Sequence, residues 1–191
     1  MTSNLKRIIR DRSPSRKNSK GWTMVELGIA ILLVSILIAG VLAYLTSNKR
    51  KITINTNSQQ LLSIAGTSIA KYGQANQYAA MTTAIAVTGG VIPEELRDPG
   101  GATTATNSYG GAIAVAPATL TGANDSLRIT WPNVTQSHCS DIVLGVANNF
   151  RRVQVQAADV KATDVAVNLA NVEAQCQSAA NVSIDFFVGR T

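Results

Sequence analysis

The sequence predicts an α+β fold, in which one long N-terminal helix packs on a roughly four-stranded antiparallel sheet. Two observations support this prediction. An apolar run at residues 27–45 passes without a proline into an amphipathic segment at residues 46–75. After that segment, short stretches of alternating apolar and polar residues are separated by turn-forming sequences. The first pattern is typical of one long helix whose first half lies in apolar surroundings and whose second half packs on a globular domain. The second pattern is typical of a small antiparallel sheet.

Residues 22–45 are long enough to cross a membrane as one helix. This stretch of 24 residues contains a single charged side chain, Glu26. At about 1.5 Å per residue it reaches about 36 Å, and a bilayer's hydrocarbon core is about 30 Å thick. An ionisable group in such a segment costs about 3 kcal/mol or more, so Glu26 is a candidate functional residue. A cut after Gly21 would create a cationic partner for it, the α-amino group of Trp22.

A basic leader precedes this stretch. The chain has 17 Lys and Arg against 11 Asp and Glu, a net charge of +6, and residues 1–21 hold seven of the bases and one acid. The remaining residues are therefore neutral overall, with ten of each sign, and no nucleic-acid partner is predicted. A plain signal anchor is one alternative interpretation of residues 1–45, and a secretory signal peptide is another. Its apolar region would span about 7–15 residues and precede the cleavage site, whereas here the run is longer and follows Gly21.

These features resemble the processing site of type IV prepilins. The leader ends at Gly21, the hydrophobic Trp22 follows, and Glu26 is the fifth residue after the glycine. The resemblance implies a type IV pilin fold, with cleavage after Gly21 and methylation of the Trp22 amine by a prepilin peptidase. It also implies that Glu26 meets the N-terminal amine of a neighbouring subunit during assembly. Trp22 and the 21-residue leader resemble the type IVb class, and the head resembles its thin-pilus branch.

The resemblance also implies three regions: a cleaved leader at 1–21, a transmembrane and filament-core helix at 22–45, and a periplasmic or extracellular head at 46–191. The implied partners are further copies of the chain in a pilus, prepilin peptidase, the inner-membrane assembly machinery and, before assembly, membrane lipid. The precursor is expected in the inner membrane of a Gram-negative bacterium. The mature protein is expected in an extracellular pilus for adhesion, aggregation or mating contact. A secretion pseudopilin and a membrane-anchored periplasmic binding module that does not polymerise are the alternatives.

The amphipathic segment and the connection after it carry different signals. Apolar residues recur at steps of three and four along residues 54–72, so one side of this helix is expected to face the head. The basic triplet Lys49-Arg50-Lys51 suggests anchoring at the membrane edge. In the long connection at 76–107, Pro93 is expected to open a helical turn, and residues 98–101 to form a tight turn.

Strands are predicted at 108–115, 126–131, 153–156 and 182–188, helices at 137–152 and 168–180, and either strand or loop at 157–167. Ser137 or Ser140 is the expected cap of the first of these helices. Leu127, Ile129 and Trp131 share a face that is expected to cover the long helix.

Two cysteines, Cys139 and Cys176, follow the membrane segment. In an oxidising compartment, two cysteines in one small domain most simply form a disulfide, and the spacing fits no metal or redox motif. The resemblance agrees, since type IV pilins commonly carry a C-terminal disulfide that delimits a variable surface region, here residues 139–176.

Enzymatic motifs are missing from the sequence. His138 adjoins Cys139, but neighbours on a helix do not face each other, so a surface histidine is the better interpretation. Gly110-Gly111 lacks the lysine and the following helix of a phosphate loop, which favours a close backbone approach or a β-bulge. The acidic residues show no paired pattern. The sequence therefore predicts a non-enzymatic protein without a cofactor or a metal.

Overall fold

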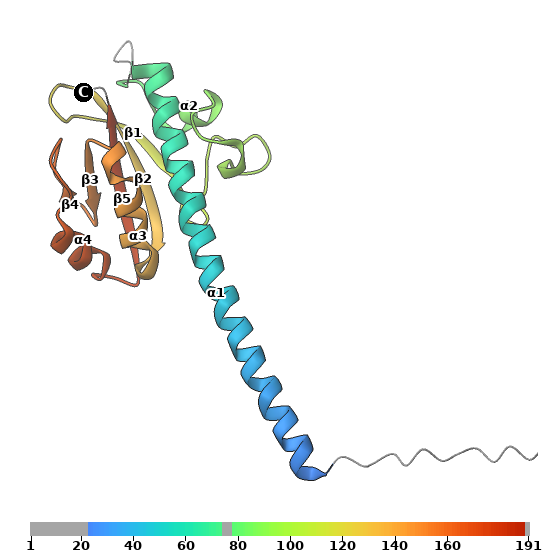
Figure 1. Ribbon diagram of the computed structural model, residues 1–191. Helices are drawn as coiled ribbons and strands as arrows, with labels where there is room; N and C mark the ends of the chain where they lie inside the picture. The colour runs from blue at the N-terminus through green and yellow to red at the C-terminus, as the bar shows by residue number, and fades with distance from the viewer. Residues whose placement is uncertain (1–22, 74–77, 190–191) are drawn as a thin grey trace, which may run out of the picture. The chain divides into compact units, whose positions relative to one another are not determined.

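In the computed structural model, which describes residues 23–73 and 78–189, the chain divides into two compact units at residues 1–44 and 45–191. Helix α1, Met24–Ser68, begins in the first unit and ends in the second, where it continues as a short π-helix, Ile69–Gly73 (Figure 1). The predicted long helix is therefore present through Gly73. The proposed leader at 1–21 and Trp22 lie outside the described residues.

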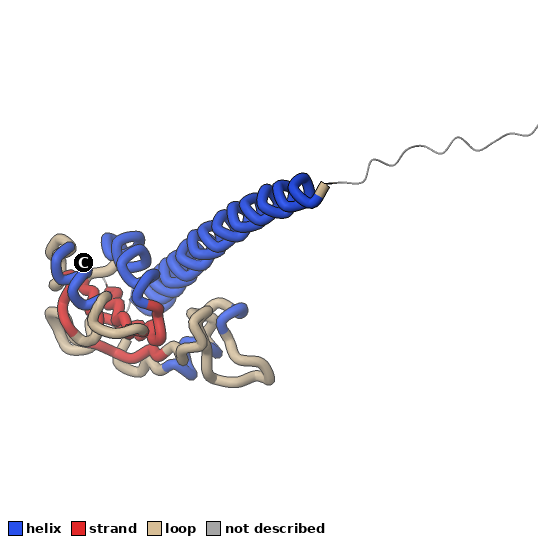
Figure 2. The backbone as a smooth tube through the Cα atoms, turned by 90° about the horizontal axis from the view of Figure 1, so that it is seen from below, coloured by secondary structure: helices blue, strands red, loops and turns tan. Residues whose placement is uncertain are grey.

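The second unit contains a five-stranded antiparallel sheet in the order β1-β2-β5-β3-β4. The C-terminal strand β5 pairs with both β2 and β3, so the centre of the sheet is completed only by the last part of the chain (Figures 1 and 2). The observed α+β fold is the predicted one, with one strand more than expected. The strands are β1 Ala114–Ala118, β2 Ser126–Thr135, β3 Arg152–Val155, β4 Ala158–Lys161 and β5 Asn181–Gly189.

The additional strand is β4, which lies in the segment that fitted either strand or loop. It follows β3 after the two residues Gln156 and Ala157, whose φ angles are 51° and 65°. Two consecutive positive φ angles are typical of a type I′ hairpin turn, which a sequence usually marks with Asn-Gly or Asp-Gly. Since Gln-Ala carries no such signal, the hairpin could not be recognised from the sequence.

The first hairpin, β1 and β2, extends beyond its predicted ends because it accommodates two prolines. β1 contains Pro117, which an edge strand tolerates because its outer N–H groups need no partner strand. β2 continues through Pro132, where the register with β5 shifts and Asn133 has a φ angle of 63°. A bulge of this kind tolerates a residue that cannot donate to the ladder. The predicted ends of these two strands, at residues 115 and 131, were therefore wrong.

Residues 108–113, predicted as strand, form a loop instead. The buried Asn107 organises this loop, because its Oδ1 accepts hydrogen bonds from the N–H groups of Tyr109 and Gly111, each at 2.9 Å. A Cβ atom on Gly111 would lie 2.5 Å from the Pro132 carbonyl oxygen. The close backbone approach predicted for Gly110-Gly111 is therefore confirmed at Gly111.

The loop between β1 and β2 closes around one carboxylate. Asp125 accepts hydrogen bonds from the N–H groups of Leu120, Thr121 and Gly122, each at 2.8 Å, and from the Thr121 hydroxyl at 2.6 Å. Burial raises the pKa of the Asp125 carboxyl, but these hydrogen bonds outweigh burial and hold the pKa well below its ordinary value. The ionised carboxylate therefore stabilises the loop at neutral pH.

Short helices complete the head: α2 Thr83–Thr88, a 3₁₀ turn Glu94–Leu96, α3 Gln136–Val146, a 3₁₀ turn Ala147–Asn149 and α4 Leu169–Cys176. The turn after Pro93 is confirmed. α3 ends before Arg152 because that residue begins β3. Its N-cap is Thr135 rather than Ser137 or Ser140, and the Thr135 side chain makes no capping hydrogen bond.

The C-terminal end of the α3 segment is closed by a lysine from β4. The Lys161 side chain is buried, and its Nζ donates to the carbonyl oxygens of Ala147, at 2.9 Å, and Phe150, at 2.5 Å. A cation is favourable here because the carbonyl groups at a helix C-terminus carry partial negative charge. Lys161 thereby ties β4 to the adjacent helical segment.

The core lies between the sheet and the second half of α1. Leu127, Ile129 and Trp131 are fully buried, as predicted for the face that covers the helix, and α1 contributes Leu61 and Ile64 to the same apolar cluster. A polar contact also lies within this core. The buried Asn57 of α1 accepts a hydrogen bond from the Trp131 indole N–H at 3.1 Å. This bond satisfies the indole N–H, which would otherwise be costly to bury.

Candidate functional site

Glu26, the candidate assembly residue, lies in the first turn of α1. Thr23 caps this turn: its hydroxyl accepts a hydrogen bond from the Glu26 N–H at 3.3 Å, and its carbonyl accepts one from the Leu27 N–H at 3.1 Å. A carboxylate is favourable at this position because the N-terminus of a helix carries partial positive charge. Glu26 is exposed and forms no ion pair with any residue in the described part of the chain.

The other two residues of the predicted processing site, Gly21 and Trp22, lie outside the described residues. Residues 24–44 present large apolar side chains, and most of them are more than half exposed, among them Ile29, Leu37 and Val41. By length and composition, the helix that begins at Met24 is the one candidate membrane span within residues 23–73 and 78–189. Such a helix fits either a membrane or the interior of an assembly.

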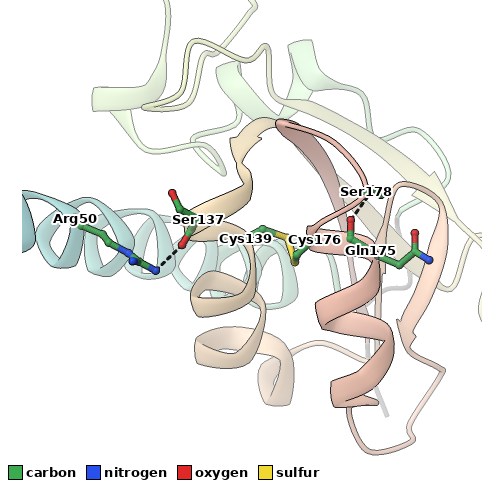
Figure 3. The surroundings of a disulfide bond; sticks show 6 residues. All are labelled: Arg50, Ser137, Cys139, Gln175, Cys176 and Ser178. Atoms are coloured by element: carbon green, nitrogen blue, oxygen red, sulfur yellow. Dashed lines mark hydrogen bonds between the residues drawn. A yellow bond between two sulfur atoms is a disulfide. The ribbon is translucent and has the colours of Figure 1, made fainter.

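Cys139 and Cys176 form the predicted disulfide (Figure 3). Cys139 lies in α3 and Cys176 is the last residue of α4, and their Cα atoms are 5.6 Å apart. Both residues are buried. The bond therefore joins α3 to α4, two helices that are separated in the sequence by β3 and β4.

The segment between the two cysteines does more than cover the surface. It supplies two of the five strands and many core residues, which include Ile142, Val143, Val153, Val155 and Val160, all fully buried. The disulfide thus closes a loop whose interior belongs to the core of the head.

Arg50 links α1 to α3 near this disulfide. Its guanidinium donates to the Ser137 carbonyl oxygen at 2.6 Å and to the Asp141 carboxylate at 2.8 Å. Both charged side chains are about half exposed, so the ion pair contributes roughly 0–1 kcal/mol. The basic triplet at 49–51 was interpreted as a membrane-edge anchor alone, and the sequence contains no signal for a contact between residues so far apart.

His138 is more enclosed than a surface residue. Its Nδ1 lies 2.9 Å from the Tyr109 hydroxyl oxygen, and the two rings meet edge to face. Burial and the nearby Arg50 lower the pKa of His138, with partial opposition from Asp141. Burial raises the pKa of Tyr109 to about 12. Because Cys139 is in the disulfide, His138 has no adjacent thiol to activate.

A groove of about 820 Å³ lies beside the disulfide, between α3 and α4. Its lining includes the apolar Leu144 and Leu169, which are 46% and 65% exposed, and the polar Arg50, Ser137 and Glu173. Across residues 23–73 and 78–189, no three side chains of His, Cys, Asp or Glu are grouped to hold a metal ion. The groove offers contact surface rather than catalytic groups.

Comparison with known proteins identifies this head. The sequence model of the family described as PilS N terminal matches residues 48–187. The type IV b pilin from Salmonella typhi has a similar structure, with 24% sequence identity and a TM-score of 0.58 over 71% of this chain and 99% of that one. TcpA, a type IV pilin from Vibrio cholerae El Tor biotype, is similar with 21% identity and a TM-score of 0.55 over 71% and 98%. No curated protein sequence matches the chain significantly.

These comparisons agree with the elements described above. The match at 48–187 covers well over half of the chain and includes the second half of α1, strands β1 to β4, β5 up to residue 187 and both cysteines. The two similar structures are less than 25% identical to this chain and therefore establish its fold alone. The chain therefore belongs to the PilS N-terminal family and has the fold of a type IVb pilin.

Proposed function

We propose that this chain is the structural subunit of a type IVb pilus, cleaved after Gly21 and methylated on the Trp22 amine by a prepilin peptidase. The observation that carries the proposal is Glu26, the one charged residue of an otherwise apolar membrane-length segment, in a chain whose head has the type IVb pilin fold. A free-standing membrane anchor has no use for a carboxylate at this position, because the group lowers the stability of insertion by about 3 kcal/mol.

In this proposal Glu26 acts only when two subunits meet. Cleavage after Gly21 removes the basic leader and creates an ammonium group on Trp22. The carboxylate of one subunit then pairs with the ammonium of its neighbour in the apolar core of the growing filament. Opposite charges within about 4 Å attract strongly in a medium of low dielectric constant, and each compensates for the desolvation of the other.

The first half of α1 changes its surroundings during this process. Before assembly, residues 27–45 lie in the inner membrane of a Gram-negative bacterium, with the basic leader on the cytoplasmic side. In the extracellular filament, the same apolar side chains exchange lipid for neighbouring helices, so assembly does not expose them to water. The partners are other copies of the chain, prepilin peptidase and the inner-membrane assembly machinery.

The heads would form the outer surface of a filament used in adhesion, aggregation or mating contact. This is a structural role, without catalysis and without a cofactor. The test is immunogold electron microscopy of the native cells with antibodies raised against the head. We expect labelled surface filaments that disappear when the coding sequence is deleted and return when it is restored. Label confined to the cell envelope, with no filament, would contradict the proposal.

A further inference from the structure

A pocket of about 710 Å³ lies in the head, separate from the groove beside the disulfide. It is lined by residues of the 3₁₀ turn after α3, of β4 and of the loop that follows β4. Its volume is within the range of pockets that hold small molecules, roughly 300–1,000 Å³. The lining residues that could contact a ligand through charged, polar or apolar groups include Asn148, Asn149, Arg151, Lys161, Asp164 and Val165.

The charges that line this pocket do not balance. Arg151 and Asp164 form an ion pair, in which Arg151 Nε lies 3.1 Å from Asp164 Oδ1, so these two charges cancel. Lys161 forms no ion pair with any acidic residue in the described part of the chain, and the residue is only 8% exposed. Burying an ammonium group without an opposite charge is costly. The pocket therefore has one positive charge that lacks a counter-ion.

Lys161 also has a hydrogen-bond donor in reserve. An ammonium group has three N–H donors. Two of them are used by the carbonyl oxygens of Ala147 and Phe150, and no acceptor for the third lies within residues 23–73 and 78–189. Because Phe150 and Lys161 both line the pocket, this ammonium group lies at the pocket's surface. A bound molecule with a negatively charged oxygen would supply both the missing charge and the missing acceptor.

The side chains of two asparagines add neutral polar groups to the lining. Asn148 is exposed, and its side chain forms no hydrogen bond with the described residues. The Asn149 side chain forms one long bond, from Nδ2 to the Val146 carbonyl oxygen at 3.4 Å. An amide offers two donors and one acceptor group, which suits a ligand hydroxyl that both donates and accepts. Val165, which is 57% exposed, adds an apolar surface.

We propose that this pocket binds a small hydroxylated carboxylic acid, whose carboxylate pairs with Lys161 and whose hydroxyl groups bond to Asn148 and Asn149. A carboxylate fits because a hydrogen bond between two charged groups is roughly twice as strong as a neutral one. Asp164 does not exclude such a ligand, since Arg151 neutralises it. Every lining residue belongs to the unit at residues 45–191, so the proposal does not depend on processing or filament formation.

The test titrates the full chain in detergent micelles with glucuronate, while heteronuclear NMR follows the side-chain amide signals of Asn148 and Asn149. Two comparison compounds separate the parts of the ligand: glucose has the hydroxyl groups without the carboxylate, and acetate has the carboxylate without the hydroxyl groups. We expect glucuronate to shift both amide signals and to bind at least tenfold more tightly than either compound. The absence of a shift, or equally tight binding of glucose or acetate, would overturn the proposal.

The variant Lys161→Met removes the charge and keeps a long side chain. We expect it to bind glucuronate at least tenfold more weakly than the wild type, equivalent to about 1.4 kcal/mol. Lys71→Met is the matched control, because Lys71 also donates to a carbonyl oxygen, that of Gly89 at 2.6 Å, but does not line this pocket. If Lys161→Met folds and binds glucuronate as tightly as the control, Lys161 is not the counter-ion and the proposal is wrong.

The variant Asn148→Ala gives an independent result, even when Lys161→Met does not fold. Its fold should be unchanged, because the Asn148 side chain is exposed and has no partner among the described residues. Losing one hydrogen bond to the ligand should weaken glucuronate binding about fivefold. Asn55→Ala, at an exposed asparagine of α1 outside the pocket, is the control. Equal affinity of these two variants for glucuronate would contradict the proposed site.

Discussion

Replacing Glu26 by Gln is expected to abolish surface filaments while the protein still accumulates in the inner membrane. The substitution keeps the size of the side chain and removes its charge. In the proposed filament core it leaves the Trp22 ammonium without a partner, and removing one member of a buried ion pair costs about 3–5 kcal/mol. Because every subunit contact would carry this cost, we expect at least a hundredfold fewer filaments. Insertion into the membrane should not suffer, since the segment becomes more apolar.

The control for this experiment is Glu95→Gln, the same substitution at an exposed glutamate in the turn after Pro93. It should leave the number of filaments unchanged. Filaments are counted by electron microscopy of cells that express each variant at equal levels, as checked by immunoblot of the membrane fraction. Normal numbers of filaments with Glu26→Gln would remove the assembly role proposed for this residue.

Removing the disulfide should have the largest effect on the stability of the head. The bond joins residues separated by 37 positions, and the loop-closure entropy of the unfolded chain for that length corresponds to about 4 kcal/mol. We therefore expect Cys139→Ser/Cys176→Ser to lower the melting temperature by about 10 °C, using about 2–4 °C per kcal/mol for a domain of this size. Both cysteines are replaced so that no free thiol remains to react.

Thermal unfolding of the full chain in detergent, followed by circular dichroism, measures this effect. Ser178→Ala is the control, because it removes an exposed hydroxyl two residues from Cys176. The wild type with a strong reductant should melt close to the double variant, and the control should melt close to the oxidised wild type. A double variant that melts within 2 °C of the wild type, or about 1 kcal/mol, would show that the bond does not hold α3 and α4 together as described.

Features of the sequence that act locally predicted much of this fold. The apolar run and the three-to-four spacing predicted α1, alternation predicted the buried face of Leu127, Ile129 and Trp131, and the turn after Pro93 was found where proline favours it. The disulfide was predictable because only two cysteines are present. Each of these inferences needed only the pattern of neighbouring residues or, for the disulfide, the number of cysteines.

The elements that the sequence did not predict correctly depend on backbone conformations that no side-chain pattern indicates. The β3–β4 hairpin turns at Gln156 and Ala157, where the backbone is left-handed without glycine or asparagine. Pro117 is acceptable in β1 only because that strand is at the edge of the sheet, and the strand order is a property of the complete fold. No local pattern could supply this information.

Buried and long-range polar contacts also could not be predicted from the sequence. Asn57 is fully buried and bonded to Trp131, 74 positions away, and no pattern in the sequence indicates that contact. Lys161 is buried against carbonyl oxygens at the end of the α3 segment, although lysine is usually an exposed residue. The Arg50–Asp141 ion pair spans 91 positions. Such contacts follow from the fold rather than predict it.

The most direct test of the central claim is the intact mass of the protein recovered from surface filaments, measured with and without reductant. The proposal predicts the mass of residues 22–191, increased by one methyl group and decreased by the two hydrogens lost in the Cys139–Cys176 bond. Reduction should restore those two hydrogens and leave the methyl group in place. A mass for all 191 residues, found only in the inner membrane, would contradict processing and assembly and leave an anchored domain with a pilin fold.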